Sequence, residues 1–461
     1  MPDKPLRAVL VGVQLPGVDA AAHAASLVEL ARLVQTLGYE VVGEVSQRRA
    51  RPAPGTLVGE GKLAELAGWT SGSGEVPKRA PRTAPTKARV RWDAESAAAG
   101  VPEPEEVTEH GHEPTVPAGG RRADLVVVDH ELSPSVARNL EKATGVAVLD
   151  RTRVIVEIFH RHARSREARL QVEIARFVYL VPRMRETGNS ERQQGKGAGE
   201  TTLELDRRKV RERITELRAE LKALEVEQGT RRARRLDQLR VALVGYTNAG
   251  KSSLMRALTG SDVLVADKLF ATLDTTVRAL HPESVPRILV SDTVGFIKQL
   301  PHDLVASFRS TLDEALEASL LLLVVDASDP TFRPQLAVTQ AVLAEIGAQD
   351  VPSRLVLNKI DRVDASIRAE LATEYPDALQ VSAHDPADVQ RLHELIVRWF
   401  DRDMTEEELI VPWTRGGLAS EVRARLKVLE EHHEAEGTRF RVRGRPVDVA
   451  RVRGLIASDG S

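Results

Sequence analysis

The sequence predicts an α/β protein of several domains, and three observations support this prediction. The chain has 461 residues, which is enough for about three domains. Short apolar runs alternate with stretches of helical periodicity in residues 1–166 and again in residues 237–403. In residues 167–236, apolar side chains recur every three and four positions, as they do in paired helices. The last segment, 404–461, is long enough for a small α/β domain.

The composition excludes several kinds of chemistry. Hydrophobic residues make up 42% of the chain, the formal net charge is −2, and there is no cysteine. The lack of cysteine excludes disulfides, thiolate metal sites and thiol nucleophiles, and it is typical of a reducing compartment. No apolar run approaches the ~18 residues that a membrane span needs. We therefore expect a cytoplasmic protein without a membrane span, with a monomer as the simplest state in solution.

The N-terminal region, 1–166, has the pattern of an α/β domain with an insertion. The expected strands are 8–13, 40–45, 125–129 and 146–149. The expected helices are 20–37 and one that begins at Ser133-Pro134. Residues 69–120 contain seven prolines and few large apolar side chains, which predicts a disordered insertion. Its basic half could contact RNA, although a solvated mixture of charges is the simpler interpretation.

Residues 167–236 are predicted to form an antiparallel helical hairpin. The apolar stripe of the first helix and that of the second helix are Leu170, Ile174, Phe177, Val178 and Val181, then Leu203, Val210, Ile214, Leu217, Leu221 and Leu224. The tip loop, 187–200, is rich in glycine and carries Arg192 and Lys196. A polar loop without bulky side chains suits close approach to a crowded polar surface.

Positive charge is concentrated around this hairpin. The arginines and lysine concerned are Arg151, Arg153, Arg161, Arg164, Arg166, Arg169, Arg207, Arg208, Lys209, Arg211, Arg213, Arg231, Arg232, Arg234 and Arg235. Such density in a nearly neutral chain indicates an anionic partner, and RNA, not DNA, is the expected one. The alternative is a solvated helix face paired with Glu212, Glu216 and Glu220. The candidate RNA contacts are Arg192, Lys196, Arg207, Arg208 and Lys209.

A phosphate-binding loop follows the hairpin. Residues Gly245-Tyr246-Thr247-Asn248-Ala249-Gly250-Lys251-Ser252 come directly after an apolar run and before a helical pattern. In that setting, backbone N–H groups at the turn and helix start converge on a polyphosphate. Lys251 is expected to reach the β and γ phosphates, and the Ser252 hydroxyl to bind magnesium.

Three later motifs specify the nucleotide. Asp361, in Asn358-Lys359-Ile360-Asp361, can accept two hydrogen bonds from guanine but not from adenine. Backbone N–H groups of Ser382-Ala383-His384 would complete the guanine pocket. In Asp292-Thr293-Val294-Gly295, the carboxylate would hold magnesium through water, and the Gly295 N–H would sense the γ-phosphate. The expected cofactors are GTP or GDP and Mg²⁺.

These motifs occur together with others that resemble one family. The further motifs are Arg138-Asn139-Leu140-Glu141-Lys142, Asp150-Arg151-Thr152, Leu170-Gln171-Val172-Glu173, Gly199-Glu200-Thr201 and Leu203-Glu204-Leu205-Asp206-Arg207-Arg208. Over most of the chain except 69–120, the sequence resembles the HflX family of ribosome-associated GTPases. The resemblance implies an N-terminal α/β domain, a helical hairpin linker, a Ras-like P-loop GTPase domain with a mostly parallel sheet, and a small α/β C-terminal domain. It also implies binding to the large ribosomal subunit and its rRNA, and separation of stalled or idle ribosomes.

The resemblance also assigns a switch segment, Phe270-Ala271-Thr272-Leu273-Asp274, in which Thr272 would bind magnesium and the γ-phosphate. The residues alone leave Thr272, Thr275 and Thr276 as alternatives. The chain departs from the family at the tip loop, where Gly195-Lys196-Gly197-Ala198-Gly199 replaces a more usual arginine and proline. The contacts of the tip therefore stay open.

Hydrolysis lacks an obvious side chain. Phe296 follows Gly295, where many GTPases carry a glutamine that orients the attacking water. Because a phenyl ring cannot bond to water, we expect slow intrinsic hydrolysis, with the water positioned by backbone or by the ribosome. No catalytic base is assigned.

Residues 404–461 are expected to contain a strand at 409–413, a helix at 418–432 and a strand at 438–443, whose Arg439, Arg441 and Arg443 share one face. That face could meet RNA or solvent. The sequence also allows other functions, namely an ATP- or GTP-dependent RNA remodeller, a ribosome-assembly or hibernation GTPase, and a non-ribosomal signalling switch. The remodeller would need Gly59-Glu60-Gly61-Lys62 as a second nucleotide site, whereas a glycine turn is simpler; the signalling switch leaves the hairpin without a role.

Overall fold

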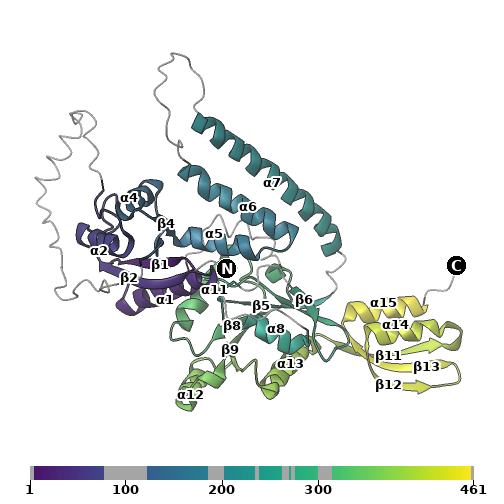
Figure 1. The fold of residues 1–461 in the computed structure, drawn as a ribbon. Helices are drawn as coiled ribbons and strands as arrows, with labels where there is room; N and C mark the ends of the chain where they lie inside the picture. Colours follow the sequence, from purple (N-terminus) through teal and green to yellow (C-terminus); the bar gives the residue numbers. More distant parts are fainter. Residues whose placement is uncertain are drawn as a thin grey trace, which may run out of the picture. The chain divides into compact units, whose positions relative to one another are not determined.

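The computed structural model describes residues 5–76, 122–184, 202–233, 238–261, 269–270, 276–298 and 314–457 (Figure 1). The chain divides into two compact units, one from residues 1–161 and 176–211 and the other from residues 162–175 and 212–461. Among the described residues, no helix is long and apolar enough to cross a membrane.

The N-terminal body is a parallel sheet between helices. Its strands are β1 (Arg7–Gln14), β2 (Glu40–Arg48), β3 (Leu125–Val128) and β4 (Ala147–Asp150), in the order β2-β1-β3-β4. Its helices are α1 (Ala20–Thr36), α2 (Glu60–Thr70), α4 (Pro134–Thr144) and α5 (Arg151–His162). Val9, Val11 and Val13 pack with residues of α2 and α4, whereas Gly12, on the other face of β1, approaches Leu27 of α1. The expected alternation of strand and helix is confirmed.

Local sequence explains the ends of α4. The Ser133 hydroxyl accepts a hydrogen bond from the Val136 N–H at the helix start, and Pro134 occupies the first turn, where its missing N–H is harmless. Gly145 ends the helix in the left-handed conformation, with φ of 70°.

The predicted insertion begins later than expected. Trp69, its predicted first residue, lies in α2 on the same helical face as Leu66, and it is only 8% exposed. Its ring packs so closely on Gly43 of β2 that a Cβ there would lie 2.6 Å from it. The prediction was wrong at this boundary because the helical period continues through Trp69; residues 77–120 lie outside the described residues.

A buried ion cluster lies at the carboxyl edge of the N-terminal sheet. Arg151, at the start of α5, is 2% exposed and bonds to Glu29 and to Asp129, with 2.7 Å between its Nη1 and Asp129 Oδ1. The Ser26 hydroxyl donates to the other Asp129 oxygen at 2.6 Å. Arg151 therefore belongs to the core, and its inclusion in the basic surface was wrong.

The hairpin consists of α6 (Arg166–Leu180), a short turn η1 (Val181–Arg183) and α7 (Thr202–Ala233), which lie side by side (Figure 1). Arg213 pairs with Glu173 at 3.8 Å and Arg166 with Glu220 at 3.3 Å. The earlier residue of α6, Arg166, pairs with the later residue of α7, Glu220, and Glu173 pairs with the earlier Arg213. The two helices therefore run antiparallel, as predicted. Ile214 and Leu217 of the predicted stripe are buried.

The end of α6 is anchored by a polar cluster. The Tyr179 hydroxyl donates to Asp150 Oδ1 at 2.9 Å, and the Arg183 guanidinium lies 3.6 Å from the centre of the Tyr179 ring. Arg183 also bonds to Asp150 Oδ2 at 3.1 Å. Burial, together with the Asp150 charge, raises the pKa of Tyr179, so the hydroxyl stays protonated as the donor.

The second sheet has six strands in the order β10-β9-β8-β5-β7-β6, parallel except for β6. They are β5 (Leu239–Gly245), β6 (Thr276–Ala279), β7 (Ile288–Asp292), β8 (Leu320–Asp326), β9 (Ser353–Asn358) and β10 (Leu379–Gln380). The helices are α8 (Lys251–Thr259), α11 (Phe332–Glu345), η2 (Ile360–Arg362), α12 (Ala365–Glu374) and α13 (Pro386–Asp401). Because side chains alternate along β5, Val241 packs with α8 and α13, and Ala242 packs with α11 and α12.

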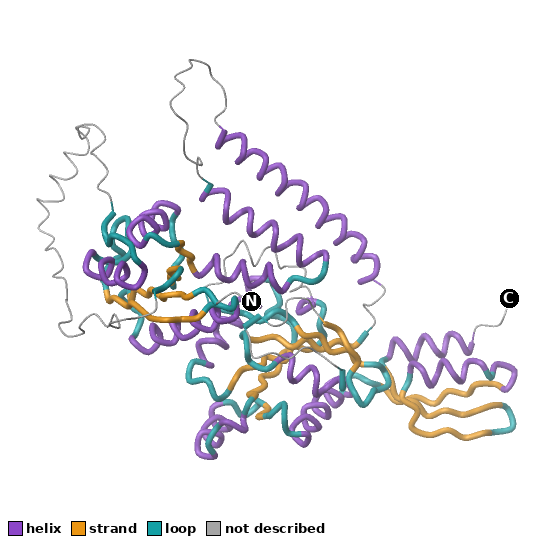
Figure 2. Tube along the Cα trace, viewed as in Figure 1, coloured by secondary structure: helices purple, strands orange, loops and turns teal. Residues whose placement is uncertain are grey.

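The C-terminal segment forms a three-stranded antiparallel sheet covered on one face by two helices (Figure 2). Its elements are β11 (Thr405–Pro412), η3 (Trp413–Arg415), α14 (Gly417–Arg425), β12 (Lys427–His433), β13 (Gly437–Gly444) and α15 (Pro446–Ala457). The predicted helix at 418–432 was wrong beyond Arg425, because residues 427–433 pair with β13. Tertiary pairing overrides the helical tendency of Leu and Glu in this stretch.

The basic face of β13 is neutralised by its neighbours. Arg439 pairs with Glu408 and Glu434, and Arg441 pairs with Glu406 and Glu430. These acids come from β11, β12 and the turn between β12 and β13. The arrangement favours the solvated interpretation of this face over an RNA surface.

The ion cluster predicts a difference between two neighbouring arginines. Arg151→Ala should lower the free energy of unfolding of the N-terminal body by about 3–5 kcal/mol, since it leaves buried carboxylates without their cation. Urea-dependent hydrogen exchange of the β1 and β3 amides would measure the loss. The matched control is Arg153→Ala, which removes a more exposed pair with Glu157 and should change stability by less than ~1 kcal/mol. Equal effects of the two substitutions would contradict the assignment.

Candidate functional site

The predicted motifs meet at the carboxyl edge of the six-stranded sheet. β5 ends at Gly245, β7 at Asp292 and β9 at Asn358, and Ser382 follows β10. Ligands of open parallel sheets bind at this edge, because the strand ends and helix starts converge there. The four motifs, far apart in sequence, therefore surround one place.

The phosphate loop is a cradle that depends on glycine at two positions. Gly250 precedes α8 with φ of 91°, and a Cβ there would lie 2.2 Å from Asn358 Nδ2. A Cβ on Gly245 would lie 2.1 Å from the Val324 carbonyl oxygen. Neither position can carry a side chain, so the backbone closes tightly before the N-terminus of α8 and leaves the N–H groups of the helix start available to an anion.

Lys251 is buried in this cradle. Its Nζ donates to the carbonyl oxygens of Gly245, at 3.1 Å, and Tyr246, at 2.9 Å. Burial lowers the pKa of Lys251 to about 8, while the nearby Asp292 carboxylate opposes the change. An anion bound beside Lys251 would compensate the buried charge, which makes the site complementary to phosphate.

The residues predicted to hold magnesium fit that ion. The Ser252 hydroxyl donates to Asp292 Oδ2 at 2.6 Å, and Asp292 is fully buried at the end of β7. A hydroxyl and a carboxylate are oxygen ligands of the kind that Mg²⁺ prefers, with phosphate and water completing its shell. The bound ion would neutralise developing charge on the phosphates. The third predicted ligand, Thr272, lies outside the described residues with Ala271, Leu273 and Asp274; Phe270 is described and buried.

The base-recognition loop is tied to the phosphate loop as predicted. Asn358 Nδ2 donates to the Ala249 carbonyl oxygen at 2.8 Å. Lys359, with φ of 59°, donates from Nζ to the Asn248 carbonyl oxygen at 2.8 Å and pairs with Asp326 at 2.7 Å. The end of the Lys359 side chain is therefore fixed between the phosphate loop and Asp326, as expected of a side chain predicted to lie along the base. Ile360 is buried and starts η2.

The predicted acceptor for guanine, Asp361, is exposed and charged. A hydrogen bond with the Ser382 side chain is the main cause that lowers the pKa of Asp361, so the carboxylate is ionised at neutral pH. The Ser382 N–H donates to Asp388 Oδ2 at 2.7 Å, and the His384 N–H points to the Ser382 hydroxyl at 3.3 Å. Ala383 lies between these two residues, in the loop that closes this side of the site.

Two positioning carboxylates were missed in the sequence. Asp326 holds Lys359, and Asp388 holds the Ser382 loop. Asp326 follows the apolar run of β8, so it stands at the same sheet edge as the motifs, and this signal could have identified it. Asp388 lies in the first turn of α13, where an acidic residue is ordinary, and nothing in the sequence singled it out.

The turn after β7 packs directly on the phosphate loop. A Cβ on Gly295 would lie 2.8 Å from Thr247 Cα and 3.0 Å from Lys251 Nζ. The Thr293 hydroxyl donates to the Leu243 carbonyl oxygen at 2.8 Å, and Val294 is buried. The Phe296 N–H donates to the Gly245 carbonyl oxygen at 3.1 Å, and the Thr247 N–H donates to the Phe296 carbonyl oxygen at 2.8 Å.

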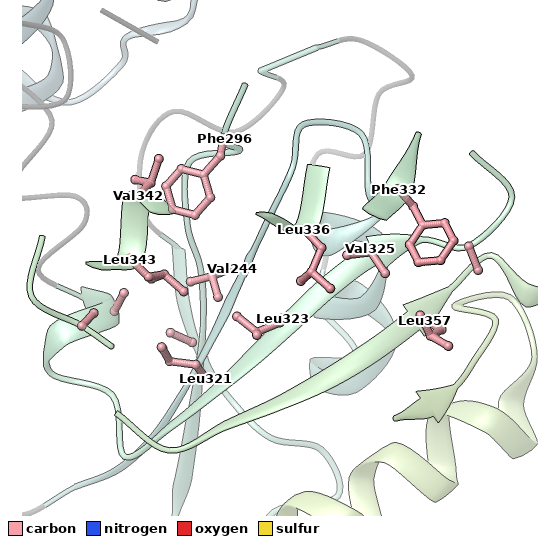
Figure 3. Close-up of a cluster of buried hydrophobic side chains, with 14 of the residues drawn as sticks. Val244, Phe296, Leu321, Leu323, Val325, Phe332, Leu336, Val342, Leu343 and Leu357 are labelled. Atoms are coloured by element: carbon pink, nitrogen blue, oxygen red, sulfur yellow. The ribbon is translucent and has the colours of Figure 1, made fainter. Parts of the chain in front are cut away.

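The ring of Phe296 lies in the hydrophobic core. It is 2% exposed and belongs to a cluster with Val244, Leu321 and Leu343 (Figure 3). The core thus holds the side chain at this position, while its backbone stays beside the phosphate loop.

The predicted RNA contacts divide into three groups. Arg207 is half-buried and donates to the Met184 carbonyl oxygen at 3.2 Å, so it supports the helical pair. Arg208 and Lys209 are exposed at the start of α7, where the Lys209 side chain is 74% exposed. Arg192 and Lys196 lie outside the described residues.

The proposed guanine acceptor predicts a change of base preference. Asp361→Asn should weaken GDP binding by roughly 10²- to 10⁴-fold, because two hydrogen bonds to a charged acceptor are lost. Binding of xanthosine diphosphate should improve, since the new amide can donate to its 2-oxo group. Competition against a fluorescent nucleotide measures both. Asp364→Asn, an exposed aspartate three residues further on, is the control and should leave the preference unchanged.

Three protein families match consecutive parts of the chain. Residues 24–74 and 105–160 match the family described as GTP-binding GTPase N-terminal, residues 162–235 match GTP-binding GTPase Middle Region, and residues 240–359 match 50S ribosome-binding GTPase.

Whole-length relatives agree with these matches. The GTPase HflX of Gluconacetobacter diazotrophicus is 59% identical over 452 residues, which cover 98% of this chain and 98% of that protein. The GTPase HflX of Escherichia coli is 35% identical over 421 residues, which cover 89% of this chain and 88% of that protein. With a P-loop GTPase sheet that brings the guanine-nucleotide motifs to one edge, this chain hydrolyses GTP, uses GTP, GDP and Mg²⁺, and belongs to the HflX family of GTPases.

Proposed function

We propose that this GTPase binds the large ribosomal subunit through its rRNA and splits stalled or idle ribosomes, with GTP controlling the bound state. The observation that carries the proposal is the antiparallel pair α6–α7. It displays exposed Arg208 and Lys209 about two turns into α7, the helix that follows the glycine-rich loop 187–200. One relative family is itself described as 50S ribosome-binding. A rigid helical pair ending in a polar loop is suited to entering an RNA-lined cleft.

The charge distribution supports the start of α7 as the RNA contact. Elsewhere, Arg151 is buried, and Arg439 and Arg441 are each paired with two glutamates. The Lys209 ammonium lies 4.0 Å from Asp206 Oδ1 in the same helix, and both side chains are exposed. Phosphate contacts by exposed cations bring affinity through release of counterions, which paired cations cannot provide as readily.

In the proposed site, Gly245–Ser252 holds the phosphates and Asp361 with Ser382–His384 holds guanine. Ser252, Thr272 and, through water, Asp292 bind magnesium, while Thr272 and Gly295 sense the γ-phosphate. Loss of the γ-phosphate would release the segments that contain Thr272 and that follow Phe296, which is the usual way in which such switches act.

Intrinsic hydrolysis is proposed to be slow, because no side chain at position 296 can orient water. Phe296→Gln should not accelerate hydrolysis, since this side chain belongs to the core cluster, and the buried amide should destabilise the protein by about 1–3 kcal/mol. Single-turnover hydrolysis and thermal unfolding test both parts. Phe332→Gln in the same cluster is the control for destabilisation alone. A rate increase of tenfold or more specific to position 296 would contradict the proposal.

The ribosomal role is tested by sedimentation with purified subunits. Binding to the large subunit should be strong with a non-hydrolysable GTP analogue and weak with GDP, and deletion of residues 187–200 should abolish splitting. Arg208→Gln combined with Lys209→Gln should weaken binding and reduce the slope of log affinity against log salt by about 1–2.

The matched control combines Arg439→Gln with Arg441→Gln, which removes two arginines that already have glutamate partners. It should leave subunit binding within about twofold of the unchanged protein. Equal sedimentation with both nucleotides, or hydrolysis that ribosomes do not stimulate, would overturn the ribosomal role. Binding without splitting would favour an assembly or hibernation GTPase.

A further inference from the structure

The hydroxyl of Thr247 is a buried polar group that the protein itself does not satisfy. Thr247 is 6% exposed, and its Oγ1 has no hydrogen-bond partner within the described part of the chain. A threonine hydroxyl can donate one hydrogen bond and accept others, and burying it unbonded is unfavourable. Two other buried threonines around this sheet are bonded: Thr293, after β7, to the Leu243 carbonyl oxygen and Thr339, in α11, to that of Gln335.

The backbone of Thr247 is fixed beside the turn that senses nucleotide state. Its N–H donates to the Phe296 carbonyl oxygen at 2.8 Å. A Cβ on Gly295 would lie 2.8 Å from both Cα and Cγ2 of Thr247, and 3.0 Å from Lys251 Nζ. Thr247, Gly295 and Lys251 therefore lie against one another, and the proposed site assigns the space beside them to the γ-phosphate.

The neighbouring side chains leave few other candidates for a polar contact there. The Phe296 ring lies in the core cluster, and the Tyr246 hydroxyl accepts a hydrogen bond from the Lys298 N–H at 2.6 Å. The Ser252 hydroxyl is directed to Asp292. Among the described side chains beside this space, that of Thr247 carries a hydroxyl that is buried and has no hydrogen-bond partner in the described part of the chain.

We propose that Thr247 is a catalytic residue of GTP hydrolysis, whose hydroxyl contacts the γ-phosphate and the attacking water in place of the glutamine that position 296 lacks. The proposal rests on the nucleotide site proposed above and is independent of the ribosomal partner. It goes beyond that site because it assigns to the phosphate loop a side-chain role in the reaction itself.

The chemistry needs no net proton transfer to Thr247. The water oxygen forms a bond to the γ-phosphorus while the bond from this phosphorus to the β–γ bridging oxygen breaks, and its electron pair leaves with GDP. The proton lost by the water ends on inorganic phosphate. Thr247 Oγ1 accepts a hydrogen bond from the water and donates its own hydrogen to a γ-phosphate oxygen, which orients the attack.

Two substitutions separate the hydroxyl from the shape of the side chain. Thr247→Val keeps the branched form without the hydroxyl, and Thr247→Ser keeps the hydroxyl. Thr339→Val, which removes a buried and bonded hydroxyl from α11 outside the site, is the control. Each full-length protein is assayed without ribosomes for affinity to fluorescent GDP, affinity to fluorescent GMPPNP, and single-turnover hydrolysis of GTP with Mg²⁺.

Thr247→Val should lower the hydrolysis rate by about 10- to 100-fold, somewhat less than loss of a dedicated oxyanion donor, because Lys251 and the Gly295 N–H remain. The ratio of GMPPNP to GDP affinity should fall by about fivefold, with GDP affinity itself unchanged. Thr247→Ser should restore both the rate and the ratio, and Thr339→Val should alter neither.

Unchanged hydrolysis and an unchanged affinity ratio in Thr247→Val would overturn the proposal. Equal losses of GDP and GMPPNP affinity would also overturn it, because they would show that the residue only shapes the loop. The proposal would fail as well if Thr247→Ser did not restore the hydrolysis rate and the affinity ratio. If the unsubstituted protein bound neither guanine nucleotide, the proposed nucleotide site itself would be wrong. The sedimentation experiment with ribosomal subunits tests the ribosomal partner and does not decide the role of Thr247.

Discussion

The nucleotide site depends on a pair of backbone hydrogen bonds between the phosphate loop and the turn after β7. The Phe296 N–H donates to Gly245, and the Thr247 N–H donates to Phe296, so the two loops pair like short parallel strands. The buried Phe296 ring holds this pairing against the core. Because the turn carries Gly295 and the loop carries Lys251, these two hydrogen bonds hold the proposed γ-phosphate contacts beside each other.

This arrangement explains why an aromatic residue stands at position 296. A glutamine there would have to leave the core to reach water, and the loop pairing would lose its apolar anchor. The buried ring anchors the turn after β7 to the core beside the phosphate loop, so position 296 does not supply a mobile catalytic side chain. Polar contacts with the γ-phosphate must then come from the loop, which is consistent with the buried hydroxyl of Thr247.

The arginines of this chain have different roles that their sequence positions do not reveal. Arg151 stabilises the N-terminal core, Arg183 anchors the end of α6 to Asp150, and Arg441 pairs with glutamates of two adjacent strands. From the sequence, Arg151 and Arg441 were candidates for a basic surface in the same way as Arg208 and Lys209. The structure buries Arg151 and pairs Arg441 with two glutamates, whereas Arg208 and Lys209 are exposed near the start of α7.

The sequence by itself determined the elements that depend on local chemistry. Apolar periodicity located the parallel strands and the hairpin. Motif spacing predicted the phosphate loop, a pair of magnesium ligands and the guanine acceptor Asp361, because backbone turns and base recognition require those residue types. Tertiary structure alone decided what depends on distant partners. Residues 427–433 form a strand because they pair with β13. Trp69 is buried because its ring packs on Gly43, which has no side chain. Asp326 belongs to the site because β8 ends beside Lys359. The physical reason is that propensity acts within a few residues, whereas strand pairing, burial and ion pairing are set by groups that only the fold brings together.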